Sequence, residues 1–367
     1  IINNYKNSKY MIRSIYEVGL IYKYENNLEK GLQYFEQIVK DYPNNIKVRE
    51  ALIEIADIKY KQKKYTESES YFNRVLNEFT LDDETCQRAT NGLRDIFLAT
   101  RQPERINEIR VKYPCANISP DDEENFYFSA ANELYVNENY EEAIPEINKY
   151  LITYPNGRFV IQLKSYLADI YYQRDEKGQA LVLYEQIIEA PVSAFTEEAL
   201  VRASKTLYND GEYMRALPHY DKLETLASTP QVIYNTRVGL MRCNYLLEFY
   251  PNATEAAQKV ISDKLINETV ELEAYYIAGM SLYKTKKYTE ALPYLSWTEK
   301  NTGTERGTEA LHFLAYSNFY LDNYDEVEKL HNQLLSRKPA YDYWIAHSLL
   351  LKGKLLMVQD DLFAAEQ

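Results

Sequence analysis

The feature of this sequence that most constrains its fold is a short motif that returns at nearly constant spacing. Each copy has a tyrosine in second place and ends on a small or short aliphatic residue, and the copies lie at 64–68, 139–143, 212–216, 287–291 and 323–327. Ala143 and Ala180 are 37 residues apart, and Ala180 and Ala216 are 36 apart. The 75 residues from Ser68 to Ala143 leave room for one poorly matched unit. Such a period is typical of a solenoid, in which each unit packs on its neighbours.

Each unit is predicted to contain two helices joined by short turns. The segment 51–61 places Leu52, Ile55 and Ala56 at helical spacing, and 66–79, which follows the motif, has an apolar face of its own. Tyr-Pro pairs near the ends of several units stop the second helix. No useful length of sequence alternates like a strand, so the predicted fold class is all-α.

At these positions the chain resembles the tetratricopeptide repeat (TPR) family, whose repeat has small residues at its eighth and twentieth positions and a proline near its thirty-second. In a unit that starts at Ile12, these positions are Gly19, Gly31 and Pro43. Small residues allow two helices to approach closely. The resemblance implies a right-handed superhelical solenoid of about nine to ten helix-turn-helix repeats.

The predicted domain organisation is a single continuous array over 1–367, truncated at both ends. Residues 5–10 align with a repeat exit, and the chain stops inside a second helix, so we expect a fragment. The period is two or three residues longer than the regular repeat. Well-matched repeats are predicted near 12–45, 49–82, 124–157, 161–194, 197–230, 272–305 and 308–341, degenerate repeats near 83–116 and 237–270, and a partial repeat from 346.

Composition and charge exclude several classes of function. The hydrophobic content of 46% is too high for a disordered chain, and no apolar run approaches the ~18 residues that span a bilayer, so we expect no membrane insertion by this segment. The net charge of −13 would repel a phosphate backbone, and nucleic acid is not an expected partner. Oligomeric state is left open.

The residues that usually carry chemistry are few. The three cysteines form no CxxC motif, so we predict neither a disulfide nor a zinc site and expect three small buried side chains. The four histidines form no HExxH motif, and phosphate-binding and nucleophile-elbow motifs are absent from the sequence. We therefore expect no catalytic residue, metal or cofactor, and a protein that is not an enzyme.

Tyrosine is unusually frequent, with 36 among 367 residues. One set opens the predicted second helices and is assigned to the core. Another set recurs at the twelfth position of the first helices, where the TPR resemblance implies a concave groove that binds peptides. The alternative is that these rings pack on the adjacent repeat. The predicted partner-binding residues are Tyr60, Phe128, Asn132, Tyr135, Asp169, Tyr172, Lys205, Tyr208, Tyr276, Tyr283, Tyr316 and Phe319, with Val201, Met280 and His312 at further groove positions.

The sequence thus predicts a protein-interaction scaffold that holds a peptide or protein segment in its groove. A cation expected for a TPR carboxylate clamp is missing beside Asn132, where Phe128 stands instead. Two alternatives are a glycan-binding module and the recruiting arm of an enzyme whose catalytic domain lies outside this sequence. The composition and the Tyr-Pro-Asn repeat exits are similar to bacterial cell-envelope TPR proteins, which favours the periplasm or a periplasm-facing lipoprotein over the cytoplasm.

Overall fold

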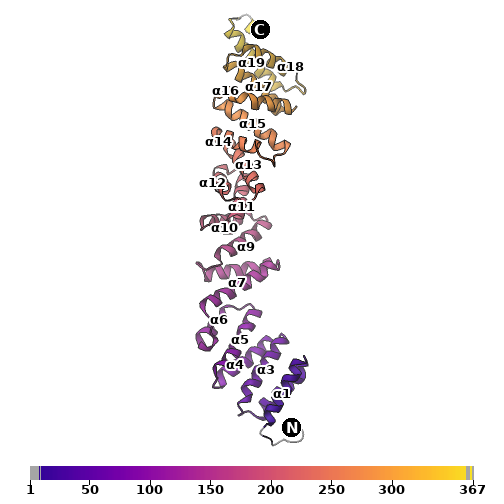
Figure 1. The fold of residues 1–367 in the computed structure, drawn as a ribbon, viewed down its shortest axis with the longest axis vertical. Helices are drawn as coiled ribbons and strands as arrows, with labels where there is room; N and C mark the ends of the chain where they lie inside the picture. The colour runs from indigo at the N-terminus through magenta and orange to yellow at the C-terminus, as the bar shows by residue number, and fades with distance from the viewer. Residues whose placement is uncertain (1–7, 9, 361–363, 366–367) are drawn as a thin grey trace. The chain divides into compact units, whose positions relative to one another are not determined.

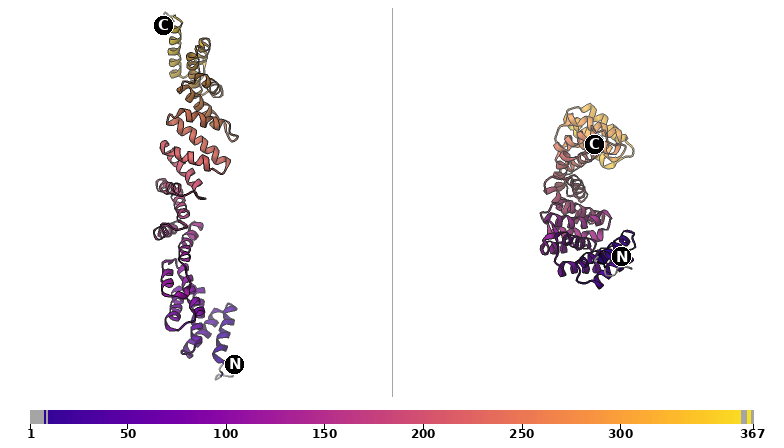
Figure 2. Two further views of the ribbon diagram at one scale, coloured as in Figure 1. Left: turned by 60° about the vertical axis from the view of Figure 1, so that its left-hand side comes forward. Right: turned by 60° about the horizontal axis from the view of Figure 1, so that its bottom comes forward.

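Helices account for all the regular secondary structure of the residues that the computed structural model describes, which are 8, 10–360 and 364–365. The predicted all-α class is confirmed, and the helices follow one another as a series of hairpins (Figures 1 and 2). Several helices begin at a side chain that accepts a hydrogen bond from their first turn, such as Asn27, Asp82 and Ser119. Residues 5–7 and 9 of the predicted repeat exit, and residues 361–363 and 366–367 of the predicted partial repeat, lie outside the described residues.

The contacts divide the chain into two compact units, Ile1–Tyr166 and Leu167–Gln367, and the boundary falls inside helix α9 (Val160–Gln173). The single continuous array therefore stays a prediction. In the first unit the helices are α1 (Met11–Tyr24), α2 (Leu28–Asp41), α3 (Lys47–Lys61), α4 (Tyr65–Glu78), α5 (Asp83–Ala99), α6 (Glu104–Lys112), the 3-10 helix η1 (Pro114–Ala116), α7 (Pro120–Val136) and α8 (Tyr140–Thr153).

In the second unit, α9 is followed by α10, by four further hairpins and by α19. These helices are α10 (Lys177–Glu189), α11 (Thr196–Asn209), α12 (Tyr213–Leu226), α13 (Pro230–Leu246), α14 (Tyr250–Ile261), α15 (Glu268–Lys284), α16 (Tyr288–Asn301), α17 (Glu305–Tyr320), α18 (Tyr324–Ser336) and α19 (Asp342–Val358). The start predicted near residue 237 for a degenerate repeat falls inside α13, whose hairpin begins at Pro230. None of the described helices is long and apolar enough to span a membrane.

Close packing at small residues joins the two helices of a hairpin and also joins neighbouring hairpins. A Cβ atom built on Gly19 of α1 would lie 2.7 Å from the ring of Phe35 in α2, and one built on Gly92 of α5 would lie 2.1 Å from the ring of Phe72 in α4, which belongs to the preceding hairpin. Both separations are far below van der Waals contact, so a larger side chain would force the helices apart. Phe35 and Phe72 are almost completely buried. Small residues predicted from the repeat pattern, such as Gly19, therefore let the helices approach closely, as expected.

A left-handed residue reverses the chain between the two helices of most hairpins. Its φ angle lies close to +60° in each turn, a conformation that costs an L-amino acid energy. Gly211, with φ +79°, is the glycine at this place in the turn between α11 and α12. The other residues at this place are Asn26, Lys63, Arg101, Glu138, Asp175, Glu248, Lys286 and Asp322.

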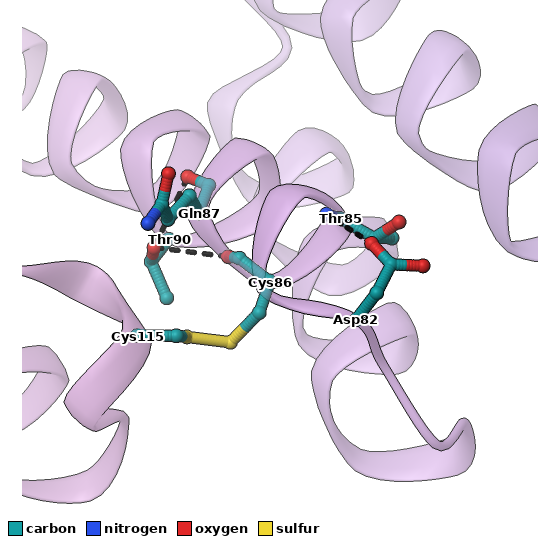
Figure 3. The surroundings of a disulfide bond; sticks show 6 residues. All are labelled: Asp82, Thr85, Cys86, Gln87, Thr90 and Cys115. Atoms are coloured by element: carbon teal, nitrogen blue, oxygen red, sulfur yellow. Dashed lines mark hydrogen bonds between the residues drawn. A yellow bond between two sulfur atoms is a disulfide. The ribbon is translucent and has the colours of Figure 1, made fainter.

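One prediction about the cysteines is wrong. Cys86 of α5 and Cys115 of η1 form a disulfide (Figure 3). It closes the repeat that contains α6, the shortest α-helix in the described part of the chain. A cross-link between residues 29 apart removes enough unfolded-state entropy to stabilise the fold by about 3 to 4 kcal/mol. Sequence spacing gave no signal because the two cysteines come together through the hairpin. Cys243 is a buried free thiol, as predicted, and burial raises its pKa to about 12.

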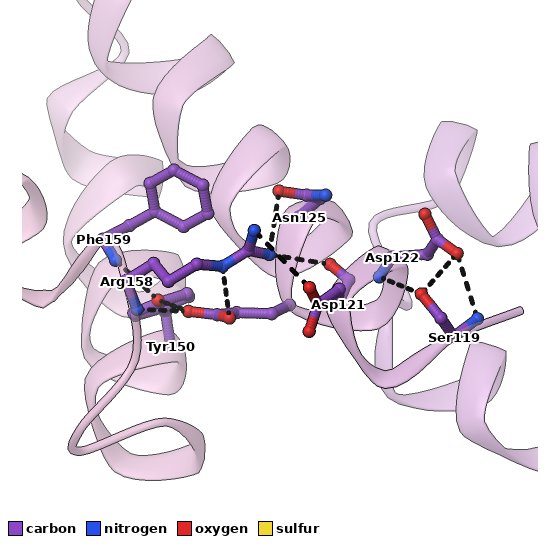
Figure 4. A network of polar contacts seen from close by, with 8 residues as sticks. Ser119, Asp121, Asp122, Asn125, Tyr150, Arg158 and Phe159 are labelled. Carbon is purple, nitrogen blue, oxygen red and sulfur yellow. Dashed lines mark hydrogen bonds and ion pairs between the residues drawn. The ribbon is translucent and has the colours of Figure 1, made fainter.

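A buried carboxylate secures the exit of α8 in the first unit (Figure 4). Glu124 of α7 accepts hydrogen bonds from the hydroxyl of Tyr150 and from both the backbone amide and Nε of Arg158, the latter two at 2.6 and 3.0 Å. The backbone amide of Phe159 donates to the hydroxyl of Tyr150 at 3.1 Å. Both Glu124 and Tyr150 are buried, so this chain of hydrogen bonds fixes the loop that leads into the next helix.

We expect opposite effects from alanine at two open glycine positions of the second unit. A Cβ atom at Gly211 or Gly178 would meet no atom within 4 Å, so packing does not distinguish the two. Gly211→Ala would place alanine in the left-handed region and lower the free energy of unfolding by about 1 to 2 kcal/mol. Gly178→Ala, in the first turn of α10, would raise it by up to about 1 kcal/mol. Urea unfolding measures both values, and equal effects of the two substitutions would contradict this account of the turn.

Candidate functional site

The first helices of neighbouring hairpins lie against one another in both units. In the first unit α3 contacts α1 and α5, and in the second unit contacts join α11 with α13, α13 with α15, α15 with α17, and α17 with α19. We call the surface built from these helices the first-helix face of each unit. All the residues predicted to bind a partner lie on first helices, so the question is what each of them contacts.

Rings predicted to line a groove are stacked on their neighbours in the first unit. Tyr135 lies flat on Tyr166, with ring centroids 3.8 Å apart, and Phe128 lies flat on Phe159 at 4.0 Å. Asn132 accepts a hydrogen bond from the hydroxyl of Tyr166 at 2.9 Å. All three predicted residues are half-buried. Their contacts match the alternative of packing on the adjacent repeat, and partner binding by them stays a prediction.

An ion network lies on the first-helix face near the start of the first unit. It was not predicted from the sequence. Glu54 of α3, only 4% exposed, accepts hydrogen bonds from Lys23 of α1, from Arg88 of α5 at 2.8 Å and from the hydroxyl of Tyr16 at 3.2 Å. The ammonium of Lys23 also lies 2.9 Å from Asp57. These charges satisfy one another and tie three first helices together.

The twelfth-position aromatic residue recurs in contact with the tyrosine that opens the second helix of its own hairpin. The ring centroids lie 5.4 to 6.2 Å apart, and the rings are tilted or edge-on. This contact holds each ring against its own turn. The pairs are Tyr60 with Tyr65, Tyr135 with Tyr140, Tyr208 with Tyr213, Tyr245 with Tyr250, Tyr283 with Tyr288, and Phe319 with Tyr324.

Cations from the following first helix cover other predicted rings in the second unit. The guanidinium of Arg202 lies 4.5 Å from the ring centroid of Tyr172, and that of Arg306 lies 5.0 Å from the ring of Tyr276. The ammonium of Lys354 lies over the ring of Tyr316 at 5.3 Å. Asp169 accepts a hydrogen bond from Gln173. Many of the rings predicted to line the groove therefore contact the neighbouring first helix instead.

A hollow of about 410 Å³ interrupts this packing in the second unit. We call it the α11–α13 pocket, because these two first helices form most of its wall. Val201, Lys205 and Tyr208, which the sequence placed in the groove, line it on the side of α11. The remaining lining residues are Ser204 of α11, Tyr220 and Leu223 of α12, Val232, Tyr234, Asn235, Thr236, Val238, Gly239 and Arg242 of α13, and Asn267 and Val270 at the start of α15.

The α13 wall of the pocket was not predicted from the sequence, because the repeat that contains it was placed too late. A copy of the motif does exist, since Tyr250 stands in second place and Ala253 closes it, 37 residues after Ala216. Proline at 251 disguises the copy. Recognition of this motif would have assigned 230–246 to a first helix and its groove positions to the site.

The walls of the pocket are mostly apolar, and its charges are unevenly balanced. The ring of Tyr220 forms part of the floor because Gly239 leaves room for it, and burial raises the pKa of Tyr220 to about 12. Arg242 donates to both carboxylate oxygens of Glu273, with separations of 2.6 to 3.1 Å. Lys205 is exposed, and its ammonium has no ion-pair partner among the described residues. An uncompensated positive charge therefore lies at the mouth of an apolar pocket.

A second aromatic cluster lies between α17 and α19 around His312, which is 3% exposed. Its ring lies 4.9 Å from that of Tyr316, 5.3 Å from that of Trp344 and 5.7 Å from that of His347. Burial, helped by the nearby His347 and Lys354, lowers the pKa of His312 to about 4. This ring is therefore neutral at pH 7 and belongs to the packing of α19. No three acidic, histidine or cysteine side chains in the described part of the chain are grouped closely enough to hold a metal ion.

Comparison with known proteins identifies the type of one of the repeats. Residues 13–45 match the family model described as Tetratricopeptide repeat, which confirms the resemblance inferred from the sequence. No curated protein matches the chain. The match covers one repeat, and the other described hairpins have the helix-turn-helix form of such repeats. Tetratricopeptide repeats are in general protein-interaction scaffolds.

Solved structures with similar helices share little sequence with the chain. The TPR domain of P58(IPK) is 16% identical over 95% of this chain and 99% of that chain, with a TM-score of 0.29. A STAND signal-transduction ATPase with a tetratricopeptide repeat sensor from Pyrococcus horikoshii is 14% identical over 88% of this chain and 52% of that chain, with a TM-score of 0.39. For Pseudomonas aeruginosa pilF the identity is 17%, the coverage 62% and 98%, and the TM-score 0.34. Scores this low indicate neither a partner nor a function.

We expect acid to destabilise the second unit through His312. Because its pKa is about 4 in the folded chain and 6.5 in the reference state, the stability contributed by the neutral ring is complete above pH 6.5 and is lost as the pH falls toward 4. Lowering the pH from 6.5 to 5 should cost about 2 kcal/mol from this residue. Urea unfolding at both pH values measures the loss. His312→Phe should reduce the loss by this amount, and an unchanged pH dependence in the variant would contradict the assignment.

Proposed function

We propose that the protein is an interaction scaffold whose second unit binds a segment of a partner protein on its first-helix face. The α11–α13 pocket carries this proposal. Along the rest of the face, predicted contact residues are engaged with neighbouring helices, whereas here apolar side chains surround a space of about 410 Å³. That volume lies within the usual range for ligand pockets, and anchor side chains of partner proteins commonly insert into such hollows.

The charge of the chain supports a protein rather than a nucleic acid as the partner. A net charge of −13 opposes binding to a phosphate backbone, and one exposed lysine at the pocket does not form a basic track. The half-buried ring of Tyr208, which lines the pocket, adds contact area that costs little conformational entropy. A partner protein would therefore contact both the pocket and the surface around it.

A substitution that fills the pocket should abolish binding. We expect Val232→Trp, which places a large ring inside the wall, to reduce partner contact at least about tenfold, because a buried anchor commonly contributes more than 1 kcal/mol. Val182→Trp is the matched control, since Val182 is 54% exposed on α10 and does not line the pocket. A circular-dichroism melt verifies that both variants fold.

The measurement is photo-crosslinking in the source cell with benzoylphenylalanine. The probe is placed at Asn235 on the rim of the pocket, or at the exposed Gln186 of α10 as a control position. We expect a protein adduct from position 235 that persists in Val182→Trp and disappears in Val232→Trp. Equal adducts from both positions, or an adduct that survives Val232→Trp, would refute binding at the pocket.

We further propose that the protein works in an oxidising compartment, the bacterial cell envelope rather than the cytoplasm. The disulfide between Cys86 and Cys115 supports this location, since such bonds persist in the periplasm and are reduced in the cytosol. We expect one alkylatable thiol, that of Cys243, when the denatured protein is trapped directly from cells, and three after reduction. Cys86→Ser should add one free thiol, and three free thiols before reduction would contradict this location.

A further inference from the structure

The pocket has a one-sided distribution of charge. Two of its lining residues, Lys205 and Arg242, are cationic, and none is acidic. Glu273 neutralises Arg242 through hydrogen bonds to both of its carboxylate oxygens, so this pair offers no net charge. The charge of Lys205 remains uncompensated, in a chain whose net charge is −13. An occupant that complements the pocket must therefore bring its own negative charge to the mouth.

The wall of the pocket favours an aromatic group inside it. Tyr208, Tyr220 and Tyr234 contribute three rings, and Val232 and Val270 contribute aliphatic surface. The absence of a side chain at Gly239 keeps the ring of Tyr220 in the floor, 2.5 Å from where a Cβ atom would stand. Aromatic rings pack on one another edge-to-face or offset, and this contributes beyond their buried area.

Two asparagines at the mouth can hold an extended backbone. The Oδ1 of Asn267 accepts the amide of Val270 at 3.1 Å, and the Oδ1 of Asn235 accepts from Gln231 at 3.1 Å. Both side chains are exposed. Their acceptor oxygens are thus engaged within the chain, whereas their amide groups still have hydrogens to donate to peptide carbonyl oxygens.

We infer that the α11–α13 pocket recognises a peptide segment in which an aromatic residue is followed or preceded directly by an aspartate or glutamate. The aromatic ring enters the pocket, the neighbouring carboxylate pairs with Lys205, and the asparagines bind the backbone. This inference rests on the proposed function, because it names the class of segment that the scaffold binds. It assigns selectivity to Lys205 and affinity to the apolar wall.

Selection from a random heptapeptide display library on the full chain tests the inference. We expect the wild-type protein to enrich peptides with an aromatic residue beside an acidic one. Lys205→Glu should keep the aromatic residue and exchange the acidic neighbour for a basic one. Lys300→Glu is the matched control, because Lys300 is exposed on the second helix α16 and does not line the pocket, and it should select the same peptides as the wild type.

The outcomes separate the inference from the proposed function. Aromatic enrichment without an acidic neighbour, or acidic enrichment that persists in Lys205→Glu, would overturn the inference and leave pocket binding intact. No enrichment by any folded variant, or enrichment unchanged by Val232→Trp, would overturn both. Two synthetic peptides, one selected sequence and its glutamate-to-lysine counterpart, then measure how much the acidic residue contributes to affinity. We expect their dissociation constants to differ about twofold to fivefold in the wild type, a preference that reverses in Lys205→Glu and shrinks at high salt.

Discussion

Close contact between a small residue of a first helix and a large side chain of an adjacent second helix is the constraint on which the structure depends. Gly279 meets Leu295 within one hairpin, whereas Gly92 meets Phe72 and Gly239 meets Tyr220 of the preceding hairpin. Because no Cβ atom could be accommodated without displacement of the facing side chain, the two helices are held at one separation. Each hairpin then presents a fixed apolar surface to the next, and successive hairpins can stack without a common core.

The same constraint also shapes the candidate site. At Gly239 the small residue admits the ring of Tyr220, and this ring becomes part of the floor of the α11–α13 pocket. On the first-helix face of the first unit, stacked rings such as Tyr135 on Tyr166 occupy the space between first helices. The first-helix face of the second unit is thus not a uniform aromatic groove. It has a hollow whose walls are mostly apolar and whose rim carries the charge of Lys205.

The sequence was sufficient to predict the helical class and the small-residue contacts, because both depend on local periodicity. It was insufficient where a feature depends on residues that the fold brings together. Cys86 and Cys115 meet only through the hairpin of α5 and α6, so no spacing rule identified them. Glu54 is one of many glutamates until α1 and α5 bring Lys23 and Arg88 to it.

Prediction of the site was limited by the placement of one repeat. Lys205 and Tyr208 were predicted as groove residues and do line the pocket, whereas Val232 and Arg242 on its other wall were missed when the motif around Tyr250 was not recognised. The other predicted rings were identified as first-helix residues, but a periodic pattern does not show whether a ring faces solvent or the next helix. That distinction required the side-chain contacts themselves.

Hydrogen–deuterium exchange of the full chain, with and without a bound peptide that has an aromatic residue beside a glutamate, tests the central claim most directly. If the second unit binds its partner at the pocket, amides in α11 and α13, at Thr196–Asn209 and Pro230–Leu246, should exchange more slowly in the complex. Those of the second helices α16 and α18 should be unchanged. Protection confined to second helices, or protection of α1 to α5 alone, would show that the partner binds elsewhere and that the pocket is not the recognition site.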